Sequence, residues 1–286
     1  MTFNDTERII LAGYIAEDNL AHANEVAAPV HVKNTFYTKY VKRAIDIVVS
    51  GLALVVTLPI NAVIAIVTFF DVGRPIFFHQ QRVGKDCKKF EIVKFRNMTN
   101  ATDEQGNLLP PKDRVTKWGK LIRKTSLDEL LNFWSILKGD MSLIGPRPLV
   151  CNYLGRYSDR HIMRHAVRPG LECPYISKIP SSGCKWQDQF ENDVWYVEHV
   201  SFITDMKMVF ALIRLVFDRK ETASRGNAMR GAFMGYDENG IAMNNSDIPQ
   251  KYIDRMYCEY GKVITKESLT DRSADEANLS ETSISV

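Results

Sequence analysis

Residues 44–70 read AIDIVVSGLALVVTLPINAVIAIVTFF, a run in which Asp46 is the only charged residue. A core helix of a soluble protein is rarely so uniformly apolar over such a length, so we expect this segment to lie in a lipid bilayer. As a straight helix it would extend roughly 40 Å, which exceeds the roughly 30 Å thickness of the hydrocarbon layer. The segment is therefore long enough to cross the membrane with a tilt.

Pro59 lies in the middle of this run, and Asn61 follows it closely. A proline lacks the helical N–H and clashes with the preceding turn, so we expect a kink or break there, with Asn61 helping to satisfy the freed backbone groups. Two half-helices of roughly 22 and 16 Å would each be too short to cross the hydrocarbon. This favours a re-entrant helix-break-helix that enters and leaves one leaflet.

Basic residues flank both ends of the run, and the positive-inside rule then favours the cytoplasm for both. A re-entrant segment satisfies this rule at both ends, whereas the alternative, a kinked single-span anchor, does not. The flanking residues are Lys39, Lys42 and Arg43 before the run, and Arg74, Arg82, Lys85, Lys88 and Lys89 after it.

The composition of the 286-residue chain, with 45% hydrophobic and 25% charged residues, is that of a globular protein. A formal net charge of +3 is too small for a polycation that coats nucleic acid, so no nucleic-acid partner is expected. The five cysteines include no C-x-x-C pair, which argues against a disulfide framework or structural zinc and for a reducing, cytosol-facing chain. The first forty residues resemble neither a secretory signal nor a transit peptide.

A basic module follows the apolar run. Gly84 separates two strand-like runs, 75–82 and 90–95, which predicts a small β-hairpin whose surplus of positive charge suits phosphates or anionic headgroups. In residues 114–124, apolar side chains recur at helical spacing between basic ones, which is typical of a helix lying in a membrane interface. An ordinary surface helix packed on a core is the alternative for this second stretch.

Two adjacent carboxylates, Asp128 and Glu129, begin a helix with an apolar face that we expect to end at Gly139. In the simplest interpretation Ser126 and Glu129 form a capping box and Asp128 complements the helix dipole.

The residues around this acidic pair point instead to chemistry. Arg123 precedes the pair. Arg147 lies between two prolines, in a rigid loop suited to bidentate phosphate contact. Arg168 lies in a similar setting, directly before Pro169 and Gly170. A divalent cation between a carboxylate and a diphosphate would cancel the repulsion that otherwise bars attack. Carboxylates, cation and fixed arginines together suggest phosphoryl transfer.

The order of these motifs resembles that of the bacterial sugar transferase family, the monotopic polyprenyl-phosphate phosphoglycosyl transferases. The resemblance runs from about Lys39 to Phe217 and includes one hydrophobic segment, as in the small members. The motifs are Lys42-Arg43-x-x-Asp46, Pro59, Pro75-x-Phe77-Phe78-x-Gln80-x-Arg82-Val83-Gly84, Lys94-Phe95-Arg96-x-Met98, Arg123-Lys124-Thr125-Ser126-Leu127-Asp128-Glu129-Leu130, Gly139-Asp140-Met141-Ser142-Leu143-Ile144-Gly145-Pro146-Arg147-Pro148 and Arg168-Pro169-Gly170.

The resemblance implies a mostly helical α/β (α+β) fold with a re-entrant helix, interfacial amphipathic helices and a small β-hairpin. It implies a monotopic enzyme in the cytoplasmic (inner) membrane that faces the cytoplasm. Asp128 would attack the β-phosphate of a UDP-sugar and release UMP, and polyprenyl phosphate would then take the phosphosugar from the aspartate. This would be the first membrane step in the assembly of a surface polysaccharide or glycoconjugate.

The resemblance also implies roles for individual residues. Asp128 would be the nucleophile, Glu129 would position Mg²⁺ or the acceptor, and both are the expected ligands of Mg²⁺. Candidate partners are UDP-sugar, polyprenyl phosphate, lipids of the cytoplasmic leaflet, a second copy of the chain as a homodimer, and downstream glycosyltransferases. The expected phosphate-binding and substrate-binding residues are Arg123, Arg147, Arg168, Lys94 and Arg96, with Pro146 shaping the loop.

The resemblance fails in residues 171–185, which read LECPYISKIPSSGCK where the family usually has Gly-Trp-Ala-Gln-Val-Asn-Gly-Arg. The family's phosphate-binding arginine is missing there, and Lys178 or Lys185 cannot reproduce its bidentate fork. Leu58 also replaces the serine commonly found before the re-entrant proline. A catalytically silent relative, acting as a membrane scaffold or regulator of a glycan-assembly complex, is therefore the alternative function. A bitopic signalling anchor with residues 1–38 outside the cell is a third hypothesis.

Both ends of the chain extend beyond the resemblance. We expect an N-terminal extension, 1–38, with a short amphipathic helix from Glu7 to Ala16, then a transferase domain at 39–217. The C-terminal extension, 218–286, has helical spacing of apolar residues between Tyr252 and Tyr260 and is expected to be disordered from about Lys266.

Overall fold

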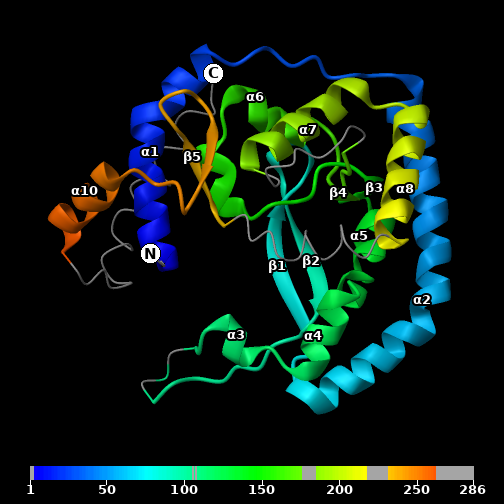
Figure 1. Ribbon diagram of the computed structural model, residues 1–286. Coiled ribbons are helices and arrows are strands. Elements are labelled where there is room, and N and C mark those ends of the chain that lie inside the picture. Colours follow the sequence, from blue (N-terminus) through cyan, green and yellow to red (C-terminus); the bar gives the residue numbers. More distant parts are fainter. Residues whose placement is uncertain (1–2, 105, 107, 176–184, 218–230, 262–286) are drawn as a thin grey trace.

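The computed structural model is mostly helical and contains three separate two-stranded sheets (Figure 1). It describes residues 3–104, 106, 108–175, 185–217 and 231–261. The mostly helical α+β class expected from the sequence is confirmed. The elements are α1 (Asp5–Glu25), a π-helical turn (Tyr37–Val41), α2 (Lys42–Val72), β1 (Phe77–Val83), β2 (Lys89–Phe95), α3 (Pro111–Arg114), α4 (Lys117–Lys124), α5 (Asn132–Lys138), β3 (Ser142–Ile144), α6 (Asp159–Ile162), β4 (Gly170–Glu172), α7 (Trp186–His199), α8 (Phe202–Phe217), β5 (Phe233–Tyr236), β6 (Ala242–Asn244) and α10 (Gln250–Tyr260), with 3₁₀ turns at Lys85–Cys87, Leu127–Glu129, Cys151–Arg156 and Met163–Ala166.

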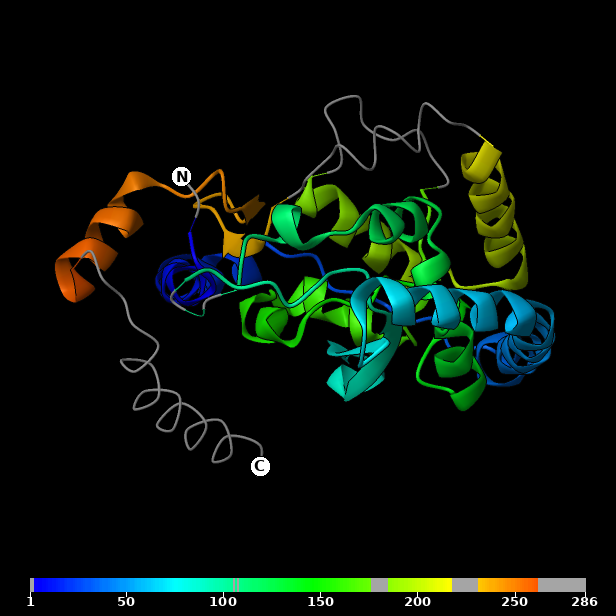
Figure 2. The same cartoon turned by 90° about the horizontal axis from the view of Figure 1, so that it is seen from below.

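The apolar run forms α2, a single helix of 31 residues with Pro59 inside it. Of the kink or break expected at Pro59, the break is not observed, because the segment stays one helix. The α2 ribbon does change direction part-way along its length, as a kinked helix does (Figures 1 and 2). Asn61 does not bond the freed backbone as expected. Its Nδ2 donates to Oγ1 of Thr57 (3.3 Å), and that hydroxyl donates to the carbonyl of Ala53 (2.7 Å). Polar side chains on both sides of the proline thus bond within the helix, but neither bond reaches the carbonyl of Val55, which Pro59 leaves without its helical N–H donor.

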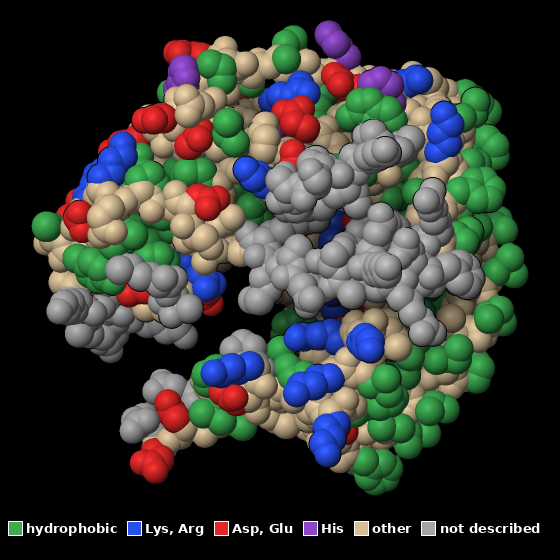
Figure 3. All heavy atoms as spheres, in the orientation of Figure 1, with side chains coloured by type: hydrophobic (Ala, Val, Ile, Leu, Met, Phe, Trp, Pro, Cys, Tyr) green, Lys and Arg blue, Asp and Glu red, His purple; other side chains and the backbone are tan. Residues whose placement is uncertain are grey.

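The outer face of α2 is apolar and exposed. Val55 is 72% exposed and Phe70 is 81% exposed. Within the described ranges, the helical stretch 37–72 is the one long and apolar enough to cross a membrane, with a mean hydropathy of 2.4 over its best window. Figure 3 shows this surface as a hydrophobic rim along α2 and α8, with Lys and Arg side chains gathered inward of the rim. An apolar helix with this much exposure belongs in a lipid environment rather than in a soluble core.

The inner face of α2 is tied to the rest of the protein by charged groups near its N-terminal end. Asp46 is 2% exposed, and its Oδ1 accepts hydrogen bonds from the hydroxyl of Ser142 and the N–H of Leu143, both at 3.0 Å. Arg43 donates to the carbonyls of Ile136 (2.6 Å) and Leu137 (2.8 Å) at the end of α5. The one carboxylate of the apolar run is therefore a structural link from α2 to β3.

The predicted β-hairpin is confirmed, with strand bounds that differ by one or two residues. Strands β1 and β2 are antiparallel, with Phe77 opposite Phe95 and Val83 opposite Lys89. This hairpin extends from the end of α2 into the centre of the molecule (Figure 1). It carries the residues that follow the membrane helix toward the acidic pair.

Helix α4 is the predicted amphipathic helix, and Thr116 caps it by accepting a hydrogen bond from the N–H of Gly119. Ile122 is fully buried against Ile64 of α2, and the indole of Trp118 donates to Thr68 of α2 (3.1 Å). Leu121 is 51% exposed. Most of the apolar face of α4 thus packs on α2, as in the alternative of an ordinary packed surface helix.

The two terminal extensions pack together. Helix α1 is longer than the predicted 7–16 helix, and it lies beside β5 and α10 in both views (Figures 1 and 2). Leu11 and Ile15 of α1 are fully buried with Met256 of α10, and Nδ2 of Asn19 donates to the carbonyl of Tyr236 in β5 (2.8 Å). A segment that precedes α2 therefore folds together with segments that follow it. The tail from about Lys266, predicted to be disordered, lies outside the described residues.

Replacing Asp46 tests the link between α2 and β3. Asp46→Ala leaves the Ser142 hydroxyl and the Leu143 N–H without their charged acceptor in a buried place, so we expect the free energy of unfolding to fall by about 2–4 kcal/mol. The matched control is Asp71→Ala, because Asp71 is an exposed carboxylate in the last turn of the same helix, and the hydrogen bond that it accepts from the Thr116 hydroxyl is exposed as well. Its loss should cost less than about 1 kcal/mol. Denaturant unfolding in detergent micelles measures both, and equal losses would contradict the proposed link.

Candidate active site

Asp128 and Glu129 lie in the 3₁₀ turn Leu127–Glu129, between α4 and α5. The capping-box interpretation is wrong, because the side chain of Ser126 makes no capping hydrogen bond and that of Glu129 points to other partners. Ser126 has a left-handed backbone (φ 55°, ψ 20°), which is costly for a residue with a side chain. The expected end of the helix at Gly139 is confirmed, since Gly139 is left-handed (φ 105°) and terminates α5, but the expected start is wrong, because α5 begins after the acidic pair and not with it.

Glu129 is held between two cations. Its Oε1 accepts hydrogen bonds from Nζ of Lys94 in β2 (2.6 Å) and from Nη2 of Arg147 (2.7 Å). Burial alone would raise the pKa of Glu129, but the positive charges of Arg147 and Lys94 outweigh that effect and hold the pKa below its ordinary value. Glu129 is therefore an ionised carboxylate that joins the β-hairpin to the loop carrying Arg147.

Asp128 has a different environment. Its side chain is 5% exposed, and its Oδ2 accepts a hydrogen bond from Nδ2 of Asn97 (3.0 Å). Arg123 donates to Oδ1 of the same Asn97 (3.3 Å), so the guanidinium reaches Asp128 through the amide. Burial and the negative charge of Glu129 raise the pKa of Asp128, and the more distant Lys94 and Arg123 offset this only in part. A buried, incompletely neutralised carboxylate is a more basic nucleophile than an exposed one.

The loop that carries Arg147 is fixed by its backbone. Strand β3 pairs in parallel with β4, and the N–H of Gly170 donates to the carbonyl of Pro146 (3.0 Å). A Cβ at Gly170 would lie 2.1 Å from the nitrogen of Gly145, so only glycine allows this approach. The fully buried Arg164 donates to the carbonyl of Arg147 (2.8 Å). These contacts fix the backbone at Arg147, while its side chain reaches Glu129.

Arg147 lines two hollows. One, of about 20 Å³, lies beside Glu129 and is also lined by Arg82 and Lys94 among others. The other, of about 310 Å³, is also lined by Trp186 and Asn192 among others. A ligand with several negative charges could compete with Glu129 for Arg147 and Lys94.

Two residues expected to bind phosphate are not brought to the acidic pair. Nε of Arg168 donates to the carbonyl of Gly139 (2.9 Å), and Arg168 lines a separate cavity. Arg96 donates to the carbonyls of Met98 and Pro75, both at 3.1 Å. Both guanidiniums thus bond backbone carbonyls. Of the other expected residues, Lys94, Arg123 and Arg147 gather around the acidic pair, and Pro146 shapes the loop through its carbonyl.

Three residues at the site were not expected from the sequence: Asn97, Arg82 and Arg164. Asn97 lies inside the motif that begins at Lys94, and its position two residues after β2 was the signal that could have identified it. Arg82 lines the pocket beside Glu129, and burial and the charge of Arg147 lower its pKa. Arg164 is paired with the equally buried Asp193 (2.7 Å). Nothing in the sequence around Arg164 indicated that it supports the loop.

The acidic pair fits the chemistry of Mg²⁺. Magnesium is usually held in proteins by one or two carboxylates together with waters and substrate phosphates. Asp128 and Glu129 supply two adjacent carboxylates, although one oxygen of Glu129 is shared by two cations. Among the described residues there is no cluster of three or more His, Cys, Asp or Glu that could hold a metal by itself. A magnesium ion at this pair would therefore rely on substrate oxygens.

Comparison with known proteins identifies relatives over the central part of the chain. The sequence model of the bacterial sugar transferase family matches residues 37–219. The uncharacterized sugar transferase EpsL of Bacillus subtilis is 41% identical over 175 residues, which are 61% of this chain and 86% of that protein.

Two further relatives have names that state an activity. The UDP-N-acetylgalactosamine-undecaprenyl-phosphate N-acetylgalactosaminephosphotransferase of Aeromonas hydrophila is 33% identical over 72% of this chain and 49% of that protein. The UDP-glucose:undecaprenyl-phosphate glucose-1-phosphate transferase of Klebsiella pneumoniae is 34% identical over 60% of this chain and 39% of that protein. The chain thus spans half or less of the length of these two relatives.

The opposite environments of the two carboxylates predict opposite effects of neutral substitutions on stability. Asp128→Asn removes a poorly compensated buried charge, so we expect a higher melting temperature near neutral pH. Glu129→Gln removes the charge that binds Lys94 and Arg147, and should cost about 1–3 kcal/mol. Thermal unfolding in detergent measures both.

The pH dependence of this experiment has a definite sign. The pKa of Asp128 is raised, so its stabilising contribution exists at low pH and is lost as the pH rises through that raised pKa. The pKa of Glu129 is lowered, so its contribution exists above its ordinary pKa of 4.5 and is lost as the pH falls through the lowered value. Shifts of the same sign in both variants near neutral pH would contradict the assigned environments.

Proposed function

Because the chain belongs to the bacterial sugar transferase family, a family of transferases, we propose that it moves a sugar 1-phosphate from a UDP-sugar to undecaprenyl phosphate. The product would be an undecaprenyl diphosphate sugar, the starting material of a surface polysaccharide or glycoconjugate. The observation that carries this proposal is the buried Asp128 beside a Glu129 whose charge is bound by Lys94 and Arg147. The relatives named for such reactions support the choice of substrates.

The first step is an attack by a carboxylate oxygen of Asp128 on the β-phosphorus of the donor. The bond between this phosphorus and the oxygen that bridges to the α-phosphate breaks, and UMP leaves with the electron pair. The sugar phosphate is then an acyl phosphate on Asp128. The raised pKa of Asp128 suits this role, because a basic carboxylate attacks phosphorus more readily.

The second step is an attack by a phosphate oxygen of undecaprenyl phosphate on the same phosphorus. This breaks the bond to Asp128, whose carboxylate is released with its electron pair and is ready for another cycle. No net proton transfer to the enzyme is needed in either step. The same buried carboxylate therefore serves first as nucleophile and then as leaving group.

The cations would neutralise the negative charge of the donor. Arg147 can bind a phosphate through two parallel N–H groups, and Lys94 can bind a phosphate as a point charge. Both would exchange their contact with Glu129 for contacts with the diphosphate, and Arg123 would approach from the side of Asn97. Bound Mg²⁺, held by Asp128 and Glu129, would supply further neutralisation of the phosphate oxygens.

The scaffold alternative receives less support from the geometry. A silent relative needs neither a nucleophile nor phosphate-binding cations, yet Asp128, Glu129, Lys94 and Arg147 are placed together. Of the two lysines considered as substitutes for the missing arginine, Lys185 is exposed at the start of α7, and Lys178 lies outside the described residues. The assembled acidic pair thus favours the enzyme.

We also propose that α2 enters and leaves one leaflet, so that the enzyme is monotopic and faces the cytoplasm. The support is that α1, before α2, shares a buried core with β5 and α10, after α2. A helix that crossed the bilayer would place these packed segments on opposite sides of it. Dimerisation and association with downstream glycosyltransferases remain predictions.

The proposed reaction predicts UMP release. Detergent-solubilised protein, supplied with Mg²⁺, undecaprenyl phosphate and a panel of UDP-sugars, should form UMP from at least one donor. Asp128→Asn should abolish this activity, because an amide is not a nucleophile toward phosphorus. Arg147→Lys should lower kcat/KM about 10²-fold or more, because a lysine cannot form the bidentate contact.

Arg255→Lys is the control for this experiment. Arg255 lies in α10, and its guanidinium binds Glu17 (3.1 Å) and Glu259 (3.3 Å) at the surface. The activity of the variant should therefore equal that of the parent protein. A folded parent protein that forms no UMP from any donor would make the scaffold the better function.

The proposed topology predicts the side on which each end of α2 is labelled. Asp5→Cys introduces a thiol at a side chain that is 94% exposed, and the native Cys258 supplies an exposed thiol after α2. With all other cysteines replaced by serine, a membrane-impermeant maleimide should label neither position in intact spheroplasts and both after permeabilisation. Labelling of the position 5 thiol alone in intact cells would show that α2 spans the membrane.

A further inference from the structure

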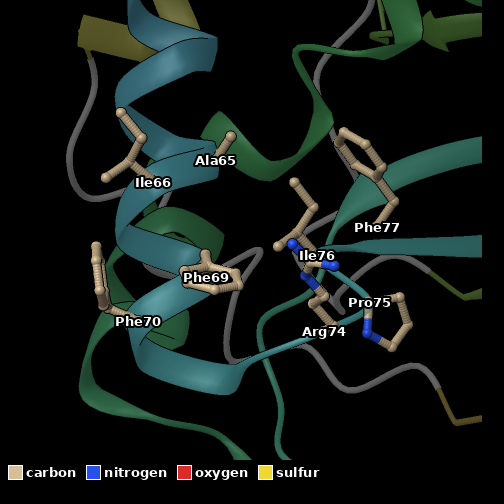
Figure 4. A pocket seen from close by; sticks show the side chains of 8 residues that line it. All are labelled: Ala65, Ile66, Phe69, Phe70, Arg74, Pro75, Ile76 and Phe77. Carbon is tan, nitrogen blue, oxygen red and sulfur yellow. The ribbon is translucent and has the colours of Figure 1, made fainter.

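A large apolar groove lies where α2 ends and the chain turns toward β1 (Figure 4). Its volume is about 850 Å³. One wall is formed by the last turns of α2, with Ala65 and Phe69 directed toward the other wall, the segment Arg74–Phe77. The aromatic side chains of the groove are partly exposed: Phe69 by 41% and Phe77 by 38%. The groove is large enough to receive several carbons of a hydrocarbon chain.

Cationic groups stand at this groove. The guanidinium of Arg74 lies 5.6 Å from the ring centre of Phe69, and Arg74 itself is exposed. A second guanidinium, Arg96, is held close by, because its Nη1 donates to the carbonyl of Pro75 (3.1 Å). An apolar groove with cations at its edge is complementary to an amphiphile that has a hydrocarbon chain and an anionic head.

The groove is connected to the acidic pair by a short path through the backbone. The carbonyl of Ile76 accepts a hydrogen bond from the N–H of Arg96 (2.9 Å), and the next residue, Asn97, binds Asp128 (3.0 Å). With standard bond lengths, the carbonyl oxygen of Ile76 lies at most about 15 Å from the carboxylate of Asp128. These hydrogen bonds thus link the wall of the groove that carries Arg74 to the nucleophile through Arg96 and Asn97.

We propose that this groove is the binding site of the undecaprenyl phosphate acceptor, with the isoprenoid units nearest the phosphate lying between Phe69 and Phe77 and the phosphate passing Arg74 toward Asp128. The inference rests on the proposed function for the identity of the acceptor. The exposed apolar face of α2 beside the groove gives the lipid lateral access from the bilayer, so that it need not leave the membrane to react.

Photocrosslinking tests occupancy without requiring turnover. Phe69 is replaced by p-benzoylphenylalanine in protein held in nanodiscs, and radiolabelled undecaprenyl phosphate is added. The control position is Val56, which is 69% exposed on the same helix and outside the groove. We expect a crosslink at position 69 that excess unlabelled undecaprenyl phosphate suppresses and excess phosphatidylglycerol does not. Equal competition by phosphatidylglycerol, or an equal crosslink at position 56, would mean that ordinary bilayer lipid fills the groove and would overturn the proposal.

Kinetics test the role of Arg74. Arg74→Ala should raise the KM for undecaprenyl phosphate about tenfold and leave the KM for the UDP-sugar unchanged, whereas Arg74→Lys should retain most of the acceptor affinity. Arg255→Ala removes an exposed arginine far along the chain and is the control. An unchanged acceptor KM in Arg74→Ala would overturn the proposed path of the phosphate.

The two proposals fail in different ways. If the parent protein forms no UMP, the proposed function fails, but the crosslink at position 69 still reports whether the groove selects a polyprenyl phosphate over a phospholipid. If UMP forms and the crosslink does not discriminate between the two lipids, the proposed function stands and the groove is not the acceptor site.

Discussion

The constraint on which this structure depends is that both ends of one exposed apolar helix are attached to the same folded body. Near its start, Asp46 and Arg43 bind β3 and α5, and toward its end Ile64 packs on α4. The segment before the helix packs with the segments after it through α1 and α10. The helix can therefore enter a bilayer only in a way that keeps these contacts. Its bend, the β-hairpin that returns from its end, and the position of the acidic pair all follow from this attachment.

Within that frame, the candidate chemistry depends on an electrostatic difference between neighbours. Asp128 and Glu129 are adjacent in sequence, yet two cations bind Glu129 and lower its pKa, whereas burial raises that of Asp128. Both carboxylates cannot be equally well neutralised by the same Lys94 and Arg147. The one left with less compensation is the better nucleophile, and the one that is neutralised joins the β-hairpin to the loop of Arg147. Structure and proposed mechanism thus use the same set of charges.

Local patterns predicted most of the elements correctly. The hairpin, the end of α5 at Gly139 and the exposed apolar helix follow from alternation, glycine chemistry and hydropathy, which act over a few residues. The errors arose where distant groups compete with local ones. Glu129 fits a capping box in sequence, but charged partners from β2 and the Arg147 loop bind it more strongly than a backbone N–H could. A separate departure is at Pro59, where the chain stays helical although a proline has no helical N–H.

The sequence by itself determined which chemistry is available: one bilayer-length apolar run, an acidic pair and an ordered series of basic motifs that identify the family. Only the tertiary structure decided which partner each of those groups binds. It placed Lys94 and Arg147 on Glu129, brought Asn97 to Asp128, and assigned Arg168 and Arg96 to backbone carbonyls. It also packed the N-terminal and C-terminal extensions against each other, although the apolar helix lies between them in the sequence. The physical reason is that an arginine in a motif has five donors and no fixed partner, so the atoms it meets in three dimensions, and not its neighbours in the chain, determine whether it binds a substrate or holds a loop.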